Sequence, residues 1–275
     1  MHALLNKKPS KTQLMGILNV TPDSFYDQGQ WFALDLAVQR ALRISQEGAD
    51  IIDIGGESTR PGAAFVDEAE ELRRVIPLIK AIKSCGITTP LSIDTSKPAV
   101  AQAAIAHGAT FLNDILGFRH LSMRKIAAEA ALPICVMHCY ETPATMQNNP
   151  YYPQGVVPFL LDWFVKQIEL LLETGVLSEN IILDPGIGFG KTVEDNLQIL
   201  QNIPKFKALG FPLLLGVSRK SFLGKIVQKP ATELLNATLA MNGMAVLNGV
   251  EIIRVHDIMA HRDLIDVLTY RSNKM

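Results

Sequence analysis

The segment PLSIDTSKPAVAQAAIAHGATFLNDI, residues 90–115, contains one complete strand–helix–strand unit. Its two ends, PLSIDTS and TFLNDI, are apolar runs too short for helices, as is typical of strands buried on both faces. The stretch between them predicts a helix, because Pro98 stands near its start and Gly108 at its end. This order of elements predicts two parallel strands joined by a right-handed crossover.

The same alternation extends along the whole chain. Eight short runs rich in Ile, Leu or Val are separated by segments with helical periodicity. The runs cover residues 13–20, 50–56, 90–96, 110–115, 132–138, 180–186, 211–218 and 251–257. Eight closing units predict an α/β fold of the TIM (β/α)8 barrel type, with eight parallel strands and outer helices. Because no segment resembles a linker, residues 1–275 are expected to form a single domain.

An open doubly wound sheet is the alternative fold for such an alternation. That fold normally carries a glycine-rich fingerprint directly after its first strand. The segment after the first run here, GILNVTPDSF (16–25), contains no such fingerprint. The sequence therefore favours the barrel.

Composition limits the partners that can be expected. The 275 residues carry a net charge of −1, so no global field attracts nucleic acid or an anionic membrane, and any anion must be bound locally. No run reaches the roughly 18 apolar residues of a membrane span, and the first residues, MHALLNKKPSKTQ, lack the apolar core of a signal peptide. The odd count of three cysteines suits a reducing compartment better than a disulfide framework, so we expect a cytoplasmic protein.

The tract CVMHC, residues 135–139, has the composition of a metal site. It lies in a run that reads as a buried strand, where cysteine is a common core residue. No second Cys/His pair follows at the spacing of a zinc finger. We therefore predict core packing for this tract.

Polar residues stand at or near the carboxyl end of nearly every apolar run. That end of a barrel is where active sites are built, and a polar group in a buried strand is unfavourable unless it is paired. The set is Asn19, Asp53, Asp94, Asn113, Asp184, Ser218, Lys220, Arg254 and His256. A structural ion pair such as Asp94–Lys220 would explain any single member equally well, but the ring as a whole indicates a functional site.

Four members of the ring suggest a deep polar pocket: Asp94, Asn113, Asp184 and Lys220. Carboxylates accept paired N–H donors. A flat heterocycle with a 2-amino-pyrimidinone edge presents such donors, together with a carbonyl group for the lysine. The residue types therefore favour a ligand of this kind.

The last run predicts an anion site. Arg254 and His256 are two residues apart in EIIRVHD and so share a face of the strand. Strand eight of such barrels often holds phosphate, and Arg60, in the loop after the second run, could reach the same area. No Ser-His-Asp order or suitable Cys-His pair suggests a nucleophile.

Six blocks, in this order, resemble those of the dihydropteroate synthase family: GILNVTPDSF, GGESTRPGA, SIDTSKPAV, LDPGIGFGK, GVSRKSFLG and IIRVHD. The resemblance extends from about residue 14 to residue 268. It implies a pterin-binding TIM barrel of folate biosynthesis, a magnesium-dependent transferase and sulfonamide target. Such an enzyme joins 6-hydroxymethyl-7,8-dihydropterin diphosphate to 4-aminobenzoate, giving 7,8-dihydropteroate and pyrophosphate. The family is commonly dimeric, so a homodimer is expected.

The resemblance also implies roles for individual residues. Asn19 would bind the Mg²⁺ that accompanies the diphosphate. The diphosphate itself would be held by Arg254 and His256, with Thr59 nearby and Arg60 brought in by loop closure. The pterin would be bound by Asp94, Asn113, Asp184 and Lys220, with Met137 against its face. The aminobenzoate pocket would be shaped by Phe25, Pro61, Phe189, Lys220 and Ser221. Asp94, Lys220, Arg254 and His256 would carry the catalysis.

Two rival functions share parts of this pattern. A folate-binding barrel of a methyltransferase would use a similar pterin cradle, but it has no need for the cationic segments SRKS and RVH. A non-catalytic pterin-binding paralogue would be expected to lose loop residues such as Asn19, Phe25 or Arg60, and all three are present.

Overall fold

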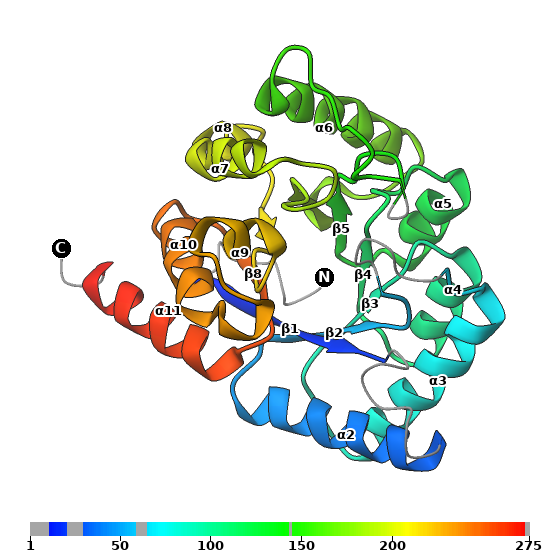
Figure 1. Ribbon diagram of the computed structural model, residues 1–275. Helices are drawn as coiled ribbons and strands as arrows, with labels where there is room; N and C mark the ends of the chain where they lie inside the picture. The colour runs from blue at the N-terminus through cyan, green and yellow to red at the C-terminus, as the bar shows by residue number, and fades with distance from the viewer. Residues whose placement is uncertain (1–10, 21–29, 59–64, 143–144, 273–275) are drawn as a thin grey trace.

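A parallel barrel forms the centre of the molecule. The computed structural model describes residues 11–20, 30–58, 65–142 and 145–272. Its eight strands pair in parallel in the order β6-β5-β4-β3-β2-β1-β8-β7, and a bridge between Leu183 and Leu213 links the two ends of this order. Figure 1 shows the helices arranged around the strands. The predicted barrel is therefore confirmed.

Each predicted run contains one strand. The strands are β1 (Gln13–Asn19), β2 (Ile51–Gly55), β3 (Leu91–Asp94), β4 (Phe111–Asp114), β5 (Ile134–Met137), β6 (Ile181–Asp184), β7 (Leu214–Leu215) and β8 (Ile252–Val255). The helices are α2 (Gln30–Gln46), α3 (Glu68–Ser84), α4 (Pro98–Ala106), α5 (Leu121–Ala130), α6 (Val156–Glu173), α7 (Val193–Gln201), α8 (Ile203–Lys207), α9 (Ser221–Val227), α10 (Leu235–Leu247) and α11 (Ile258–Ser272). Two short 3₁₀ turns, Ser178–Asn180 and Ala231–Glu233, also lie in the described ranges.

Local sequence signals explain where several helices begin. The Asp67 side chain accepts a hydrogen bond from the Glu70 backbone N–H at 2.8 Å and caps α3, whose first turn is acidic as the helix dipole favours. Helix α4 starts at Pro98, which needs no intrahelical N–H partner at that position. Thr192 and Asp195 form a reciprocal capping box at the start of α7.

The barrel interior changes from apolar to polar along the strands. Its lower layer is a buried cluster formed by Met15, Ile51, Phe111, Cys135, Ile182, Leu214 and Ile252. Because residues two apart share a face of a strand, the next inward positions are Asp53, Asn113, Met137, Asp184 and Arg254. The polar ring therefore stands on an apolar floor and faces the carboxyl ends of the strands.

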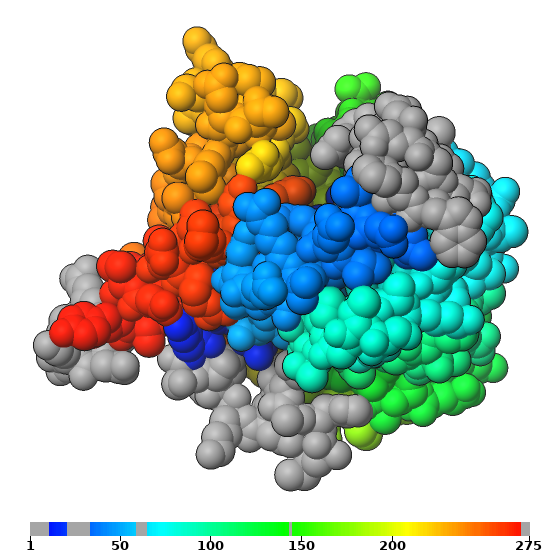
Figure 2. All heavy atoms as spheres, turned by 90° about the horizontal axis from the view of Figure 1, so that it is seen from below, coloured from blue at the N-terminus to red at the C-terminus, as the bar shows by residue number. Residues whose placement is uncertain are grey.

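A second, larger core lies between the strands and the outer helices. It contains buried side chains from both layers, among them Leu18, Ile54, Val75 and Phe164. Figure 2 shows α11, α2 and α3 following one another over one face of the molecule. None of the helices in the described ranges combines the length and the apolar character that crossing a bilayer requires.

Candidate active site

The guanidinium of Arg254 is held between two carboxylates. Its Nε lies 2.6 Å from Asp53 Oδ2, and its Nη2 lies 2.8 Å from Asp94 Oδ2. The carboxylate of Asp53 is fully buried, and its Oδ2 also accepts a hydrogen bond from Asn113 Nδ2 at 3.2 Å. A single oxygen atom, Asp53 Oδ2, therefore binds both the guanidinium of Arg254 and the amide of Asn113.

The charges in this group shift one another's protonation. Burial raises the pKa of Asp94 to about 7, although the positive charge of Arg254 opposes this rise. Burial also disfavours the charge of Arg254, but Asp53 and Asp94 outweigh it and raise the pKa of the guanidinium further above its ordinary value. Burial therefore leaves Asp94 poised to change its charge near neutral pH, although it contacts Arg254.

Asp184 and Lys220 form the opposite side of the ring. Asp184 Oδ1 accepts a hydrogen bond from the Gly186 backbone N–H at 2.8 Å, and burial raises the pKa of this carboxyl group. Lys220 Nζ donates to the Ile187 carbonyl and lies 4.5 Å from the centre of the Phe189 ring. Burial lowers the pKa of Lys220 to about 8, with Asp184 opposing the decrease. The Asp94–Lys220 ion pair considered above does not form, because Asp94 binds Arg254 instead.

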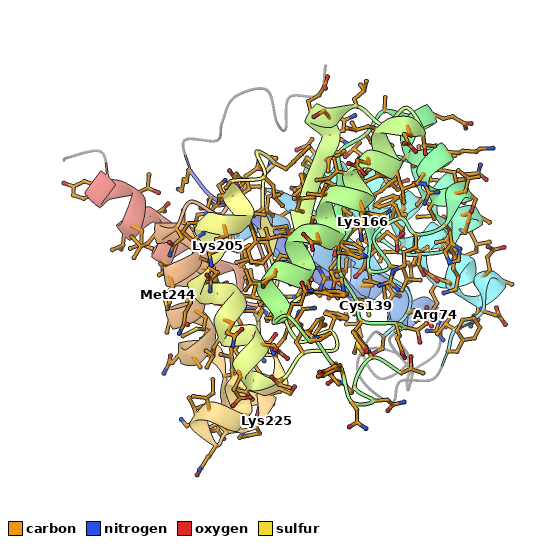
Figure 3. The ribbon with its side chains drawn as sticks, turned by 90° about the horizontal axis from the view of Figure 1, so that it is seen from above. Arg74, Cys139, Lys166, Lys205, Lys225 and Met244 are labelled. Carbon is orange, nitrogen blue, oxygen red and sulfur yellow. The ribbon has the colours of Figure 1, made fainter. Side chains whose placement is uncertain are left out.

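An apolar surface adjoins these polar groups. Met137 packs in a buried cluster with Ile115, Cys139 and Met146, and Phe189 lies against this cluster. Cys139 is fully buried inside the molecule (Figure 3). Cys135 belongs to the lower barrel layer. Core packing of these two cysteines is confirmed, and in the described ranges no group of three His, Cys, Asp or Glu residues could hold a metal ion.

The segments SRK and VHD are tied to each other. Ser218 Oγ lies 3.0 Å from His256 Nδ1 and accepts a hydrogen bond from the His256 backbone N–H at 3.2 Å. Arg219 forms a bidentate ion pair with Asp257, at 2.9 and 2.6 Å. Arg40 Nη2 donates to the His256 carbonyl at 2.9 Å. These contacts fix the His256 backbone and ring at the mouth of the barrel.

Comparison with known proteins matches this geometry to one family. The sequence profile of the family described as pterin binding enzyme matches residues 15–256. The dihydropteroate synthase of Haemophilus influenzae is 43% identical over 267 residues, which cover 96% of this chain and 95% of that protein. The chain belongs to the dihydropteroate synthase family. It is therefore a transferase of folate biosynthesis.

Solved structures of dihydropteroate synthases have the same fold. The Yersinia pestis enzyme in a sulfonamide drug complex is 39% identical, with a TM-score of 0.89 over 97% of this chain and 96% of that one. The Xanthomonas albilineans enzyme with 4-aminobenzoic acid is 37% identical, with a TM-score of 0.89 over 95% of this chain and 93% of that one. The likeness extends over almost the whole chain.

Asn19 and Ser221 lie at two edges of the site. Asn19 ends β1 beside Gly55 of β2, and a Cβ atom on Gly55 would lie 3.4 Å from Asn19 Oδ1 and 3.7 Å from Asp94 Cβ. The amide oxygen of Asn19 therefore lies on the Asp94 side of the mouth. Ser221 is the exposed first residue of α9, directly after Lys220. The remaining predicted residues, Phe25, Thr59, Arg60 and Pro61, lie outside the described residues.

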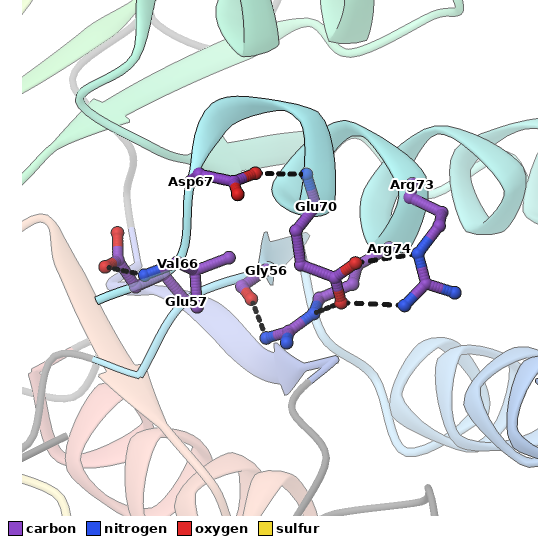
Figure 4. A network of polar contacts seen from close by, with 7 residues as sticks. All are labelled: Gly56, Glu57, Val66, Asp67, Glu70, Arg73 and Arg74. Atoms are coloured by element: carbon purple, nitrogen blue, oxygen red, sulfur yellow. Dashed lines mark hydrogen bonds and ion pairs between the residues drawn. The ribbon is translucent and has the colours of Figure 1, made fainter. Parts of the chain in front are cut away.

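A charged network, absent from the sequence-based assignment, holds the two ends of the segment between β2 and α3. Glu57 accepts a hydrogen bond from the Val66 backbone N–H at 2.9 Å, and Arg74 donates to the Gly56 carbonyl (Figure 4). Lys97 Nζ lies 2.6 Å from Glu57 and 2.5 Å from the buried Glu71. Glu57 and Lys97 belong to the blocks GGESTRPGA and SIDTSKPAV. Their membership of these blocks was the only sequence signal that could have assigned them to the site.

Proposed function

We propose that this chain joins 6-hydroxymethyl-7,8-dihydropterin diphosphate to 4-aminobenzoate, giving 7,8-dihydropteroate and pyrophosphate. The observation that carries the proposal is the position of Arg254, which stands between Asp53 and Asp94 at the mouth that also holds Asp184 and Lys220. An acidic floor beside a cationic rim suits a ligand with N–H donors at one end and a diphosphate at the other. The Xanthomonas albilineans relative with bound 4-aminobenzoic acid supports the second substrate.

The pterin would lie across the polar ring. Asp184 and Asn113 offer oxygen acceptors to its amino-pyrimidinone edge, and Lys220 offers a donor to its carbonyl oxygen. Met137 and the adjoining apolar cluster would contact one face of the ring. Phe189 and Ser221 flank Lys220 and would line the path of the arylamine.

Arg254 and His256 would bind the diphosphate. The hydrogen bonds of Arg254 to Asp53 and Asp94 use one hydrogen of Nε and one of Nη2, and a guanidinium carries five N–H donors. Donors therefore remain for phosphate oxygens while Asp53 keeps the group in place. Ser218 orients the imidazole of His256 toward the same rim.

The reaction would proceed by cleavage of the bond between the pterin methylene carbon and the diphosphate oxygen, which retains the electron pair. Arg254 and His256 stabilise the charge that develops on the departing pyrophosphate. Asp94 stabilises the positive charge left on the pterin methylene. The neutral arylamine nitrogen then forms the new C–N bond and releases a proton, so no strong general base is needed.

The donor set at the mouth fits Mg²⁺ bound together with the diphosphate. Magnesium is usually held by one or two protein oxygens, several waters and substrate phosphates, and Asn19 supplies one oxygen on the Asp94 side. When bound, the ion would supply positive charge to the departing pyrophosphate. The chain's own contribution is to hold this oxygen beside the diphosphate site.

We further propose that the protein is a cytoplasmic, single-domain homodimer. Large apolar side chains are exposed on two adjacent helices, Leu247 on α10 and Met259 and Val267 on α11. A second copy of the chain would shield them from water. Light scattering on the purified protein tests this part of the proposal.

Product analysis tests the proposed reaction. The purified chain is incubated with dihydropterin diphosphate and Mg²⁺, with and without 4-aminobenzoate, and pyrophosphate and 7,8-dihydropteroate are quantified. The proposal predicts that, with the arylamine present, pyrophosphate and dihydropteroate form in equimolar amounts, and that dihydropteroate requires the arylamine. Pyrophosphate released without formation of dihydropteroate in the presence of the arylamine, or no reaction at all, would overturn it.

A further inference from the structure

A buried lysine ends the segment PGIGFGK and takes no part in the site described above. Lys191 is 5% exposed. Its Nζ lies 3.0 Å from the Phe189 carbonyl oxygen, 3.1 Å from His138 Nδ1 and 3.5 Å from the His138 carbonyl oxygen. In the described ranges no carboxylate forms an ion pair with it. A buried ammonium group without a carboxylate is unfavourable. The three acceptors must therefore stabilise it.

His138 is a rigid partner for this lysine. It directly follows β5, and its backbone N–H donates to the Asp184 carbonyl at 2.9 Å. Its ring meets Trp163 edge-on, with 4.9 Å between the ring centres, and Phe159 at 5.8 Å. Burial and then the charge of Lys191 lower the pKa of His138 well below its ordinary value. The ring is therefore neutral, and its Nδ1 accepts a hydrogen bond from Lys191.

The other partner, Phe189, belongs to the loop between β6 and α7. This loop supplies both groups that hold Lys220, namely the Ile187 carbonyl and the Phe189 ring. It also supplies the Gly186 N–H that binds the Asp184 carboxylate. A shift of the loop would therefore move the partners of two residues in the proposed pterin site.

Three further contacts keep the loop folded without Lys191. The Tyr152 hydroxyl donates to the Gly190 carbonyl at 2.8 Å, and Gln147 Nε2 donates to the Gly188 carbonyl at 2.9 Å. Asn196 Oδ1 accepts a hydrogen bond from the Gly188 backbone N–H at 2.7 Å. Loss of Lys191 alone should therefore misplace the loop rather than unfold it.

We propose that Lys191 is a positioning residue for the condensation. It fixes the β6–α7 loop against the end of β5, and the loop in turn places Phe189 and the ammonium group of Lys220. Lys191 itself is buried and acts only through these neighbours. The inference rests on the proposed function, because it assigns Lys191 to the same site.

A graded pair of variants tests the inference. Lys191→Met removes all three donors, whereas Lys191→Gln keeps an amide that can donate to two acceptors. Lys166→Met, at an exposed position on α6 (Figure 3), is the matched control. The first readout is the rate at which acetic anhydride labels Lys220, measured by mass spectrometry. This rate does not depend on turnover, so it decides the inference even if the wild-type chain forms no dihydropteroate.

Faster labelling of Lys220 is expected in Lys191→Met, intermediate labelling in Lys191→Gln, and no change in Lys166→Met. Displacement of the loop on loss of these contacts should raise both the KM for 4-aminobenzoate and the Kd for free pterin, each by about tenfold. Unchanged labelling of Lys220 would overturn the inference. If Lys191→Met fails to fold, Lys191→Gln decides it by the same labelling measurement.

A double-mutant cycle with Phe189→Ala separates positioning from general destabilisation. If Lys191 acts through the loop, Lys191→Met should change kcat/KM much less in the Phe189→Ala background than in the wild type. Additive effects of the two substitutions would contradict the proposed route.

Discussion

Asp53 Oδ2 accepts a hydrogen bond from Arg254 Nε at 2.6 Å, and Asp53 is fully buried. The two residues are 201 positions apart in the sequence, and closure of the barrel brings them together across β1, which pairs with β2 on one side and β8 on the other. Since Asp94 binds Nη2 of the same group, the guanidinium is fixed at two points. This arrangement pre-organises a cation for an anionic ligand.

Asp53→Asn should weaken binding of the pterin diphosphate. The neutral amide cannot accept equally from Arg254 and Asn113, so the guanidinium loses its buried anchor. The loss should be about 1.5–3 kcal/mol, the range for a charge-assisted hydrogen bond, measured by calorimetry with the diphosphate and Mg²⁺. Ser92→Ala is the control, because Ser92 pairs with Asp53 in register and its hydroxyl has no hydrogen-bond partner in the described part of the chain. Equal losses in the two variants would argue against the anchor.

Asp184→Asn should raise the KM for the pterin substrate. An amide presents one donor and one acceptor where the carboxylate presents two acceptors. The Gly186 N–H already uses one oxygen of Asp184, so the variant would meet the pterin edge with its amide nitrogen. Steady-state kinetics and titration with a free pterin check this expectation, and an unchanged affinity for the pterin would refute the proposed docking.

The rate should pass through a narrow optimum near neutral pH. Burial raises the pKa of Asp94 to about 7 and lowers that of Lys220 to about 8. Asp94 therefore loses its charge as the pH falls below about 7, and Lys220 loses its charge as the pH rises above about 8. The profile of kcat/KM against pH reports groups of the free enzyme and the free substrate. Lys220→Arg should move the alkaline limb upward, and an unmoved limb would assign it to another group.

Gly186→Ala should destabilise the fold and disrupt the pterin site together. Gly186 has a φ of +68°, and a Cβ atom there would overlap the carbonyl oxygen of His138. Gly210 has a φ of +85° with no atom within 4 Å of its Cβ position, so Gly210→Ala measures the conformational penalty alone. That penalty is about 1–2 kcal/mol, and Gly186→Ala should exceed it clearly in thermal unfolding. Similar stability of the two variants would contradict the tight packing of this loop.

The order of elements was predictable from the sequence because parallel barrel strands are buried on both faces. Each appears as a compact apolar run, and each predicted run contains one strand. The polar ring was also visible, since residues such as Asn113 and Asp184 interrupt runs that are otherwise apolar. Both signals are local, so they can be recognised in a single sequence without an alignment.

The pairing within the site could not be predicted in the same way. The sequence analysis considered an ion pair of Asp94 with Lys220, and only the three-dimensional structure shows that Asp94 binds Arg254 instead. Lys191 was hidden for a related reason. Its partner His138 lies 53 residues away, in a tract that the sequence marks only as a buried strand. Contacts between the ends of different strands depend on how the barrel closes, and no local sequence pattern determines which residues then meet.

Calorimetry on Arg254→Ala tests the central claim most directly. The claim is that one mouth binds the pterin at its acidic floor and the diphosphate at its cationic rim. The variant and the wild type are titrated with the pterin diphosphate in the presence of Mg²⁺ and, separately, with the free pterin. The account predicts a loss of roughly 2–4 kcal/mol for the diphosphate and little change for the free pterin. An equal loss for both ligands would contradict it and assign Arg254 to the structure of the barrel alone.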